Sequence, residues 1–278
     1  NSHYLALLYT DFFPRPGKRN GAWMTSYKEQ YIDKQGNDSR PHISIVCNFT
    51  RPTTSAPSLL TFGELTTLFH EFGHALHGML SKVTYPSLSG TNVARDFVEL
   101  PSQLMENWCY EEETLRLFAS HYQTGEPLPI EWVQKIKEAS AFMEGILSVR
   151  QLNFGFLDMA WHTYPHLERL ESVRPFEQEA TKATQLYPPI ETMCISPAFS
   201  HIFSGGYAAG YYSYKWSEVL DADAFEAFKE VGIFNTEIAS RFRREILEKG
   251  SSEKESLLYK RFRGQDPTPD ALIRRAFH

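Results

Sequence analysis

The segment from Thr61 to Ser81 constrains the fold more than any other part of this chain. It opens with a helix-start signal, because Thr61 can cap the first turn and Glu64 can reach back to the backbone of Thr61. Apolar residues then recur at the spacing of one helical face: Leu65, Leu68, Phe69, Phe72, Leu76 and Leu80. The sequence therefore predicts an amphipathic helix with one face in a core.

The same helix carries two histidines, His70 and His74, with Glu71 directly after the first of them. Residues four apart lie on one face of a helix, so both imidazoles can reach the same ion. Glu71 lies about 100° round the helix from His70, where it can take a proton from a water molecule on that ion. This arrangement is typical of zinc hydrolases, and it predicts a metal site on the helix.

A catalytic zinc ion of this kind needs a third protein ligand. Three carboxylates follow the histidines and are candidates for it: Asp96, Glu99 and Glu106. They would share one face if a single helix runs through Pro101, so the spacing alone leaves the choice among them open. A carboxylate that does not bind the metal could instead orient one of the histidines.

Three separated blocks of the sequence are informative together: HEFGHALH (residues 70–77), DFVELPSQLMENW (residues 96–108) and FSHIFSGGYAAGYYSYKW (residues 199–216). Their content and order resemble the thimet oligopeptidase family of zinc metallopeptidases, in particular its oligopeptidase A and peptidyl-dipeptidase branch. The resemblance implies one zinc ion per chain, held by His70, His74 and Glu99. It also implies that the chain is the C-terminal catalytic portion of a longer protein, whose N-terminal region is a missing partner.

The third block supplies side chains for a different task. Peptide hydrolysis builds an oxyanion at the attacked carbonyl, and phenol or imidazole groups can stabilise that charge in a water-poor cleft. By resemblance, the side chains that act on the transition state beside Glu71 are His201, Tyr211 and Tyr214, and Tyr207 binds substrate. Gly205 and Gly206 are also expected to bind substrate, because glycines suit a turned loop that a peptide backbone can approach closely. The alternative is that the tyrosines pack in a core with their hydroxyls at its rim.

Two other polar features are interpreted as structural. His77 lies about 10.5 Å along the helix axis from His70, too far to share an ion with both His70 and His74. We interpret His77 as a core histidine or as a support for the metal ligands. Asp158 and His162 are also four residues apart, but no third ligand is evident, so we interpret them as a pair on a helix surface.

The sequence predicts a mainly α fold with a small β-sheet, organised as one zincin-like metallopeptidase catalytic domain over residues 1–278. Strands are expected in residues 1–57, most clearly at residues 42–50, and residues 58–278 are expected to be helical. The strand at 42–50 either offers its edge to an extended peptide or is purely structural. Helices are predicted at residues 61–81, 96–122, 130–161, 213–229, 235–248 and 254–262.

Composition argues against several other classes of function. The 278 residues include 28 Lys and Arg against 34 Asp and Glu, a formal charge of −6, which gives no general affinity for nucleic acid or an anionic membrane. We find no apolar run long enough to span a bilayer and no secretory leader, although a leader could lie upstream of Asn1. The three cysteines lack metal or redox spacing and predict reduced thiols and a cytoplasmic location: Cys47, Cys109 and Cys194.

These observations predict a zinc-dependent metallopeptidase that hydrolyses short peptides, as an oligopeptidase or as a peptidyl-dipeptidase. Two alternatives stay open. One is a catalytically silent peptide-binding protein with the same fold, although such a protein has little reason to retain His70, Glu71 and His74 together. The other is a zinc amidohydrolase that acts on a non-peptide substrate. Peptide turnover that stops with a chelator and returns with zinc separates the three.

Overall fold

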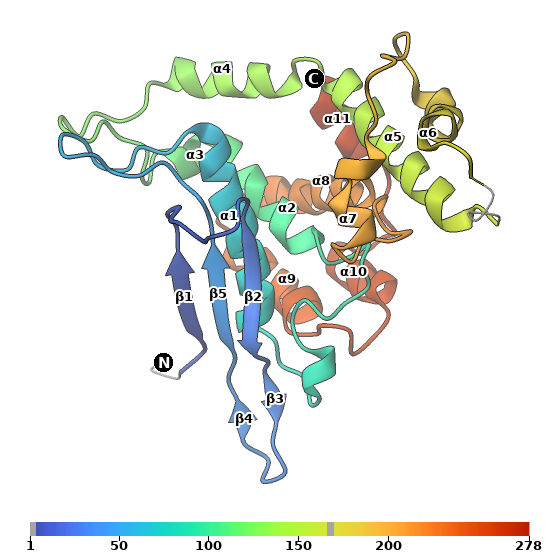
Figure 1. Ribbon diagram of the computed structural model, residues 1–278. Coiled ribbons are helices and arrows are strands. Elements are labelled where there is room, and N and C mark those ends of the chain that lie inside the picture. The colour runs from blue at the N-terminus through green and yellow to red at the C-terminus, as the bar shows by residue number, and fades with distance from the viewer. Residues whose placement is uncertain (1–3, 166–169, 278) are drawn as a thin grey trace.

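A computed structural model describes residues 4–165 and 170–277 of the chain. Its strands all lie near the N-terminus, and the sheet occupies one side of the molecule (Figure 1). In sequence order the strands are β1 (Leu7–Asp11), β2 (Trp23–Lys28), β3 (Tyr31–Ile32), β4 (Asp38–Ser39) and β5 (His42–Val46). The prediction of a small sheet in residues 1–57 matches this arrangement.

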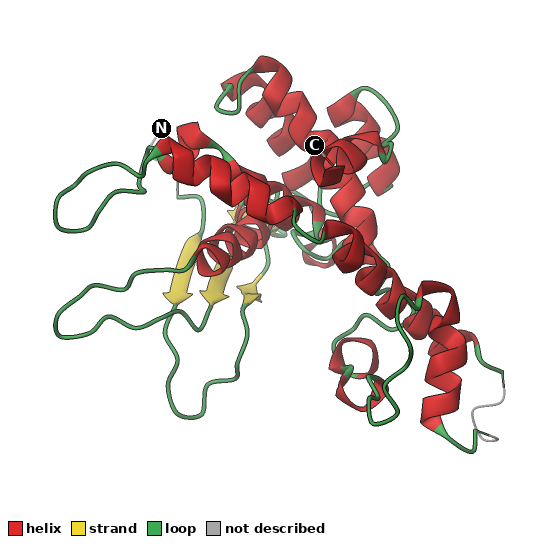
Figure 2. Ribbon diagram, turned by 90° about the horizontal axis from the view of Figure 1, so that it is seen from above, coloured by secondary structure: helices red, strands yellow, loops and turns green. Residues whose placement is uncertain are grey.

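The helices follow from Phe62 onward and fill the other side of the molecule (Figure 2). They are α1 (Phe62–Met79), α2 (Leu100–Glu106), α3 (Glu112–Leu115), α4 (Ile130–Ala141), α5 (Glu144–Thr163), α6 (Val173–Thr181), α7 (Ser200–Phe203), α8 (Ser213–Val231), α9 (Thr236–Phe242), α10 (Glu255–Arg263) and α11 (Asp270–Phe277). A π-helical turn, Arg243–Leu247, continues α9. The helices predicted at 61–81, 213–229 and 254–262 correspond closely to α1, α8 and α10.

The capped start of α1 is confirmed. The Thr61 side chain accepts a hydrogen bond from the backbone N–H of Glu64, and the Glu64 carboxylate accepts one from the backbone N–H of Thr61. One oxygen of the same carboxylate also accepts hydrogen bonds from the backbone and hydroxyl of Thr50. These bonds fix where α1 begins relative to the strand segment before it.

The three-stranded sheet has the order β1-β5-β2, with β1 parallel and β2 antiparallel to β5. The predicted apolar face of residues 42–50 is buried and packs with Ala75 and Met79 of α1: Ile43, Ile45, Cys47 and Phe49. This contact ties the sheet to the helix that carries the histidines. The position of β5 in the sheet therefore also fixes where α1 packs on the sheet.

The central position of β5 contradicts one prediction. Its backbone pairs with β1 on one side and with β2 on the other, so it has no free edge for a peptide. The proposal that the strand at 42–50 receives substrate is therefore wrong. We missed β2 because its sequence, WMTSYK, lacks the apolar alternation that identifies a half-buried strand. Within the described part of the chain, β2 is the edge strand on one side of the sheet and β1 on the other.

Two predicted helices are wrong in extent. The helix predicted at 96–122 is instead α2, a 3-10 turn at Asn107–Tyr110 and α3, which ends at Leu115. It begins only at Leu100, because Pro101 has no N–H and fits the first turn of a helix but not its interior. The helix predicted at 130–161 is interrupted between α4 and α5 at Met143, whose φ of 61° is left-handed. Sequence reasoning also missed α6 and α11.

A second and larger core lies on the far side of α1 from the sheet. It joins α2, α8, α9 and α10 through aromatic side chains, among them Trp108, Phe225, Phe228, Phe242 and Phe262. Leu76 of α1 packs against both this core and the one under the sheet. In residues 4–165 and 170–277, no helix combines the length and the apolar character needed to cross a bilayer.

Candidate metal centre and active site

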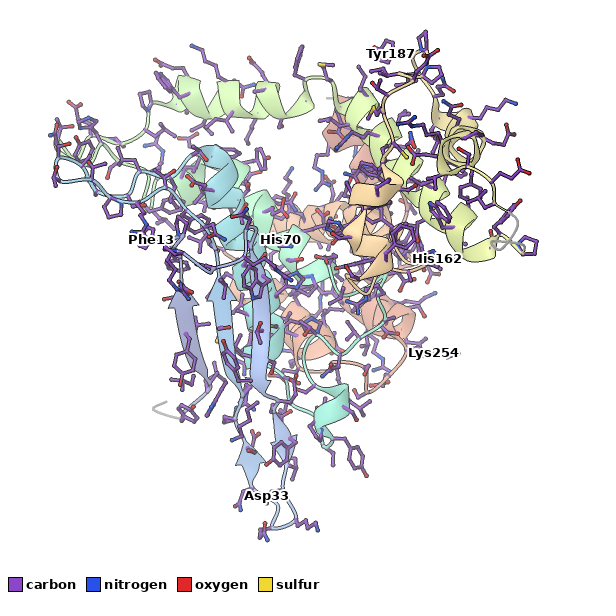
Figure 3. All side chains as sticks on the ribbon, viewed as in Figure 1. Phe13, Asp33, His70, His162, Tyr187 and Lys254 are labelled. Atoms are coloured by element: carbon purple, nitrogen blue, oxygen red, sulfur yellow. The ribbon has the colours of Figure 1, made fainter. Side chains whose placement is uncertain are left out.

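The face of α1 that carries the two histidines meets the start of α2. The Nε2 atoms of His70 and His74 lie 3.4 and 3.1 Å from the same oxygen, Oε2 of Glu99. Ligand atoms of the three side chains all lie within 4.8 Å of one another. The structure thus brings together the three residues that the resemblance implies as metal ligands, and His70 lies near the centre of the molecule (Figure 3).

A glycine between the histidines lets α2 approach α1. A Cβ atom at Gly73 would lie 2.5 Å from the carbonyl oxygen of Pro101 and 2.5 Å from Cα of Ser102. The close contact brings Glu99, the residue before α2, within reach of the histidines. The hydroxyl of Ser102 then donates to Oε2 of Glu99 at 3.0 Å. Gly73 and Ser102 therefore help to place the carboxylate, and sequence analysis had assigned them no role.

The electrostatics of this cluster favour a cation. Burial opposes ionisation of Glu99, but hydrogen bonds with His70 and His74 outweigh it and hold the pKa of Glu99 well below its usual range. Burial also lowers the pKa of His70, yet the carboxylates of Glu106 and Glu99 outweigh it and raise that pKa to about 10. Positive charge between the imidazoles and the carboxylate is therefore stabilised, whether a proton or a metal ion supplies it.

Glu71 lies on the same helix with a different environment. Its side chain is buried, and Oε2 has no hydrogen-bond partner among the described residues. Burial raises the pKa of Glu71 above its ordinary value, against the opposing charges of His70 and His74. A carboxylate with a raised pKa and an unoccupied oxygen is suited to accepting a proton near neutral pH.

The two rival carboxylates have other partners. Glu106 of α2 lies with Oε1 2.6 Å from Nδ1 of His70, so it orients the ring whose Nε2 faces Glu99. Asp96 precedes α2 and accepts a hydrogen bond from the hydroxyl of Tyr212 at 2.7 Å. Of the three candidate carboxylates for the third metal ligand, only Glu99 lies close to both histidines among the described residues.

His77 is a core histidine in this structure. It is fully buried, and burial lowers its pKa to about 3, so its ring is neutral. Neither ring nitrogen has a hydrogen-bond partner in the residues that the structure describes. The alternative that His77 supports the metal ligands through a hydrogen bond is therefore wrong.

The third sequence block forms α7, a loop and the start of α8. The hydroxyl of Tyr207 donates to Oε1 of Glu99 at 2.6 Å. The rings of Tyr207 and Tyr214 stack with their centroids 5.0 Å apart, and the ring of Tyr211 lies 5.1 Å from that of Tyr214. His201 of α7 lies beside them, 5.9 Å from the ring of Tyr211. The block therefore borders the metal cluster through Glu99.

The three tyrosines are half-buried rather than packed inside the core. Burial raises the pKa of Tyr207 and of Tyr214, and the negative charge of Glu99 raises both further. Burial also raises the pKa of Tyr211. The phenols therefore stay protonated at neutral pH and can donate hydrogen bonds. The alternative that the tyrosines are core-packing residues holds in part for Tyr211, whose ring packs against Phe199.

The glycines of the block shape its turn. Gly206 has a φ of 81°, in the left-handed region that favours glycine. A Cβ atom at Gly205 would lie 2.8 Å from Cα of His201. Both glycines are exposed, so the backbone around them is open to a ligand. Gly205 and Gly206 directly precede Tyr207, and their role in substrate binding stays a prediction.

Asp158 and His162 do not form the predicted surface pair. Asp158 is fully buried, and its two oxygens accept hydrogen bonds from the backbone N–H groups of Ala209 and Tyr211 at 2.9 and 2.8 Å. Nδ1 of His162 lies 2.8 Å from Oδ1 of Asp158. The spacing of the pair was visible in the sequence, but its partners lie about fifty residues further along the chain and could not be recognised from spacing.

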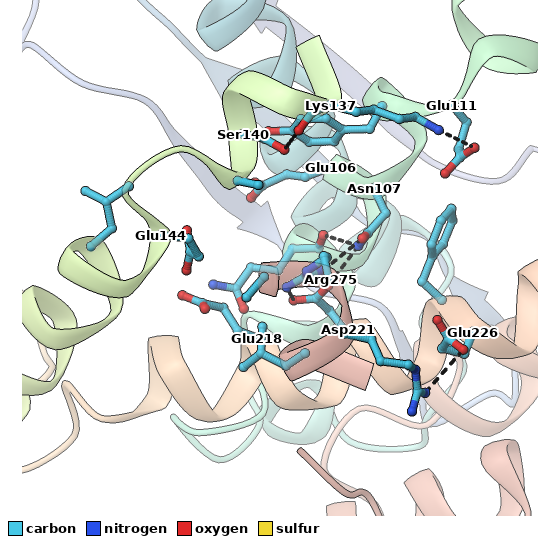
Figure 4. Close-up of a pocket in the computed structure, with 18 of the residues that line it drawn as sticks. Glu106, Asn107, Glu111, Lys137, Ser140, Glu144, Glu218, Asp221, Glu226 and Arg275 are labelled. Atoms are coloured by element: carbon cyan, nitrogen blue, oxygen red, sulfur yellow. Dashed lines mark hydrogen bonds and ion pairs between the residues drawn. The ribbon is translucent and has the colours of Figure 1, made fainter. Parts of the chain in front are cut away.

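Two cavities are lined by residues that border the cluster. One, of about 1030 Å³, lies between α2, α4, α5, α8 and α11, and its lining mixes carboxylates with basic side chains (Figure 4). Glu106, the partner of His70, forms part of its wall. The other, of about 760 Å³, is lined by His201, Tyr211 and apolar side chains. Arg150 of α5 borders both cavities.

Comparison with known proteins assigns this chain to a family. The sequence profile described as Peptidase family M3 matches residues 1–276. The chain belongs to peptidase family M3. Oligopeptidase A of Escherichia coli (strain K12) is 43% identical over 274 residues, which cover 98% of this chain and 40% of the relative. Dipeptidyl carboxypeptidase of the same strain is 43% identical over 264 residues, which cover 95% of this chain and 38% of the relative.

A solved structure shares the fold of this family M3 chain. PZ peptidase A with inhibitor 2 matches with a TM-score of 0.59 and 17% identity, over 96% of this chain and 42% of that one. The resemblance drawn from three sequence blocks and the predicted fold class are thereby confirmed. The chain spans about 40% of the length of the curated relatives that it matches.

Membership of this metallopeptidase family implies a metal ion, and the side chains present fit one. Two imidazoles and one carboxylate converge, a ligand set that leaves a tetrahedral metal with an open position. The oxygen Oε2 of Glu71 is buried beside them without a partner among residues 4–165 and 170–277. A buried polar atom of this kind normally has a partner, and a water or substrate group at a metal would supply one.

Proposed function

We propose that this chain is the catalytic part of a zinc-dependent metallopeptidase that hydrolyses short peptides, as an oligopeptidase or as a peptidyl-dipeptidase. The observation that carries the proposal is the convergence of ligand atoms from His70, His74 and Glu99 within 4.8 Å of one another, on the helix that also bears Glu71. The expected content is one zinc ion per chain. Two imidazoles and a carboxylate are a common ligand set of catalytic zinc.

The proposed roles follow from the position of each group. His70, His74 and Glu99 hold the zinc ion, and Glu106 fixes the ring of His70 through Nδ1. When bound, zinc lowers the pKa of water towards about 7 and polarises a carbonyl group. Glu71 accepts a proton from the attacking water and delivers it to the leaving amine nitrogen. No covalent intermediate with the protein is required.

The tyrosine block is proposed to act on the charge that develops at the attacked carbonyl. Tyr211 and Tyr214 are protonated donors, and His201 lies beside them. Donors fixed in advance near a developing oxyanion lower its free energy without reorganising during the reaction. Tyr207, whose hydroxyl is bound to Glu99, is proposed to contact the substrate together with the exposed backbone at Gly205 and Gly206.

An extended peptide needs a backbone partner near the metal. An edge strand presents unpaired N–H and C=O groups that can hold a peptide of any sequence. Of the sheet's two edge strands, β2 is proposed for this role because it packs against α1, the helix that carries the histidines. This proposal replaces the one made for β5. In this proposal the substrate lies along β2, beside α1.

We also propose that residues 1–278 form a single catalytic domain of a longer enzyme, with the strands in residues 1–57 and the helices in residues 58–278. Leu76 supports this, because it packs against both main cores. The proposed partner is the remaining region of the same protein, which would cover exposed apolar residues such as Trp132 and Phe142 and limit the size of substrates. Three free cysteines support a cytoplasmic location.

The proposal is tested with an internally quenched peptide. Turnover by the chain is expected to stop with a chelator and to return with zinc, while Glu71→Gln keeps its zinc and loses nearly all hydrolysis. The amide preserves the shape of the side chain but cannot act as a base. Turnover by Glu71→Gln at the parental rate would contradict the role of Glu71. Peptide binding without turnover would favour a silent binding protein, and turnover only of a non-peptide amide would favour an amidohydrolase.

A further inference from the structure

The loop that carries the tyrosines is exposed over most of its length and includes one strained residue. Between Ser204 and Tyr212 most residues are exposed, and Ala209 has a φ of 52°, a left-handed conformation that costs free energy for any residue other than glycine. Such a conformation persists only where the surroundings impose it. Something outside the loop therefore has to hold the chain at Ala209.

Asp158 of α5 is that external contact. Its carboxylate is fully buried, and each oxygen takes one backbone N–H of the loop: Oδ1 that of Ala209 at 2.9 Å, and Oδ2 that of Tyr211 at 2.8 Å. Two hydrogen bonds to residues two positions apart in a chain fix both its position and its direction. Since burial of a carboxylate is costly unless hydrogen bonds compensate it, the two N–H groups and Asp158 depend on each other.

The anchored residues lie in the chain between Tyr207 and Tyr214, whose rings stack beside Glu99. Tyr211 is itself one of the two bonded residues, and its ring lies 5.1 Å from that of Tyr214. The other side of the loop is held by Arg95, whose guanidinium lies 5.0 Å from the centre of the Tyr207 ring. Of the three candidate tyrosines, Tyr207 is bound to Glu99 and Tyr214 belongs to α8, so Asp158 acts from α5 on the remaining one, Tyr211.

We propose that Asp158 is a positioning residue that sets the catalytic conformation of the tyrosine loop and thereby the placement of the Tyr211 hydroxyl. This inference rests on the proposed peptidase function, which it deepens. Asp158 touches neither substrate nor metal in this scheme. It acts by fixing the backbone of Tyr211 against α5, and His162 beside it fixes the carboxylate. A displacement of about 1 Å in such a group can cost on the order of a hundredfold in rate.

The test is Asp158→Asn in the full chain. Asparagine keeps one acceptor oxygen but turns an NH2 group toward the other backbone N–H, so one of the two bonds is lost without a change in size. We expect kcat for a quenched peptide to fall by about 10- to 100-fold, while KM and zinc content stay near the parental values. Exchange of the Ala209 and Tyr211 amides, followed by NMR, is expected to accelerate by about tenfold or more.

Asp223→Asn is the matched control. Asp223 is another buried carboxylate, which accepts a hydrogen bond from Tyr259 at 2.6 Å in the core of α8 and α10. Asp223→Asn is expected to lower the melting temperature and to leave kcat and the exchange rates of the Ala209 and Tyr211 amides unchanged. A merely structural role for Asp158 predicts the same behaviour for both variants, and that result would overturn the inference.

The readouts separate this inference from the proposed function. An active parent with unchanged kcat in Asp158→Asn rejects the positioning role and leaves the peptidase proposal intact. If the parent fails to cleave peptides, the peptidase proposal fails, and the inference is then decided by amide exchange alone. Unchanged protection of Ala209 and Tyr211 in Asp158→Asn rejects it in either case.

Discussion

The two halves of the candidate site are built in different ways. The metal half consists of α1 and the start of α2, where His70, His74 and Glu99 are placed by helix periodicity and by one close contact between helices. The tyrosine half is a loop, and it is placed by hydrogen bonds that its backbone N–H groups and the Tyr212 hydroxyl donate to carboxylates far away in the sequence. Local geometry determines the first half, and long-range contacts determine the second.

This difference has consequences for mutation. A change in the metal half is expected to alter metal binding, because its polar side chains are the proposed ligands themselves. A change in the tyrosine half is expected to alter the rate with the metal still bound, because only Tyr207 of that half contacts a proposed ligand, at Glu99. Measuring metal content and kcat on the same variants therefore separates the two halves.

The largest effect is expected for Glu99→Ala in the metal half. The substitution removes the carboxylate between the two imidazoles, so we expect zinc content to fall sharply and hydrolysis to disappear with it. Asp96→Ala is the control, because Asp96 binds the hydroxyl of Tyr212 instead. Metal analysis of both purified variants decides the matter. Normal zinc in Glu99→Ala, with loss in Asp96→Ala or Glu106→Ala, would move the third ligand.

A smaller effect is expected for Tyr211→Phe and Tyr214→Phe. Each substitution removes one hydroxyl donor and keeps the ring, so kcat should fall by about a hundredfold to a thousandfold while zinc stays bound. Tyr164→Phe, directly after α5, serves as the control because Tyr164 is exposed and its ring contacts that of Phe176. Steady-state kinetics on the three variants test the assignment. If neither loop variant changes kcat or KM, the tyrosines are packing residues.

The contact between α1 and α2 can be tested by adding a single methyl group. Gly73→Ala would place its Cβ 2.5 Å from backbone atoms of Pro101 and Ser102, so α2 has to move and carries Glu99 with it. We expect the free energy of unfolding to fall by about 1–3 kcal/mol and zinc to bind more weakly. Gly63→Ala lies on the same helix with nothing within 4 Å of its Cβ. Equal behaviour of the two variants in denaturant titration would contradict the role of Gly73.

The metal half could be predicted from the sequence because its signals are local. The capping pair of Thr61 and Glu64, the apolar stripe and the four-residue spacing of His70 and His74 all lie within one helix. Glu99 could not be chosen by spacing, because Pro101 starts a new helix and ends the assumption of one continuous face. The family resemblance supplied that assignment, and the approach of α2 at Gly73 accounts for it physically.

The residues of the tyrosine half could be predicted from the sequence, but the contacts that hold them in place could not. Its glycines and tyrosines indicated a loop with donors, yet its anchors are Asp158 on α5 and Asp96 before α2. Hydrogen bonds between residues so distant in sequence leave no periodic trace. The break between α4 and α5 was missed for a similar reason, since the left-handed Met143 shows no signal of its own in the sequence. The late start of α2 differs, because Pro101 is a local signal for it.

The smallest effect is expected from a second carboxylate anchor, on the segment that leads to His201. Glu177 of α6 accepts hydrogen bonds from the backbone N–H groups of Ile195 and Ser196 at 2.8 and 2.9 Å and from the Ser196 hydroxyl at 2.7 Å. Burial opposes ionisation, but these bonds outweigh it and lower the pKa of Glu177 below its ordinary value of 4.5.

Because the pKa of Glu177 is lowered on folding, the stability that its charge contributes depends on pH. A carboxylate whose pKa is lower in the folded state stabilises the fold fully above its unfolded pKa, and this contribution is lost as pH falls through the folded pKa. At pH 7 we therefore expect Glu177→Gln to be less stable than the parent by about 1 kcal/mol, and the difference to shrink as the pH falls below 4.5. Thermal melts of the two proteins across that range measure it. A difference that stays constant with pH would mean that the charge of Glu177 does not hold the segment, and that packing alone orders this side of the tyrosine half.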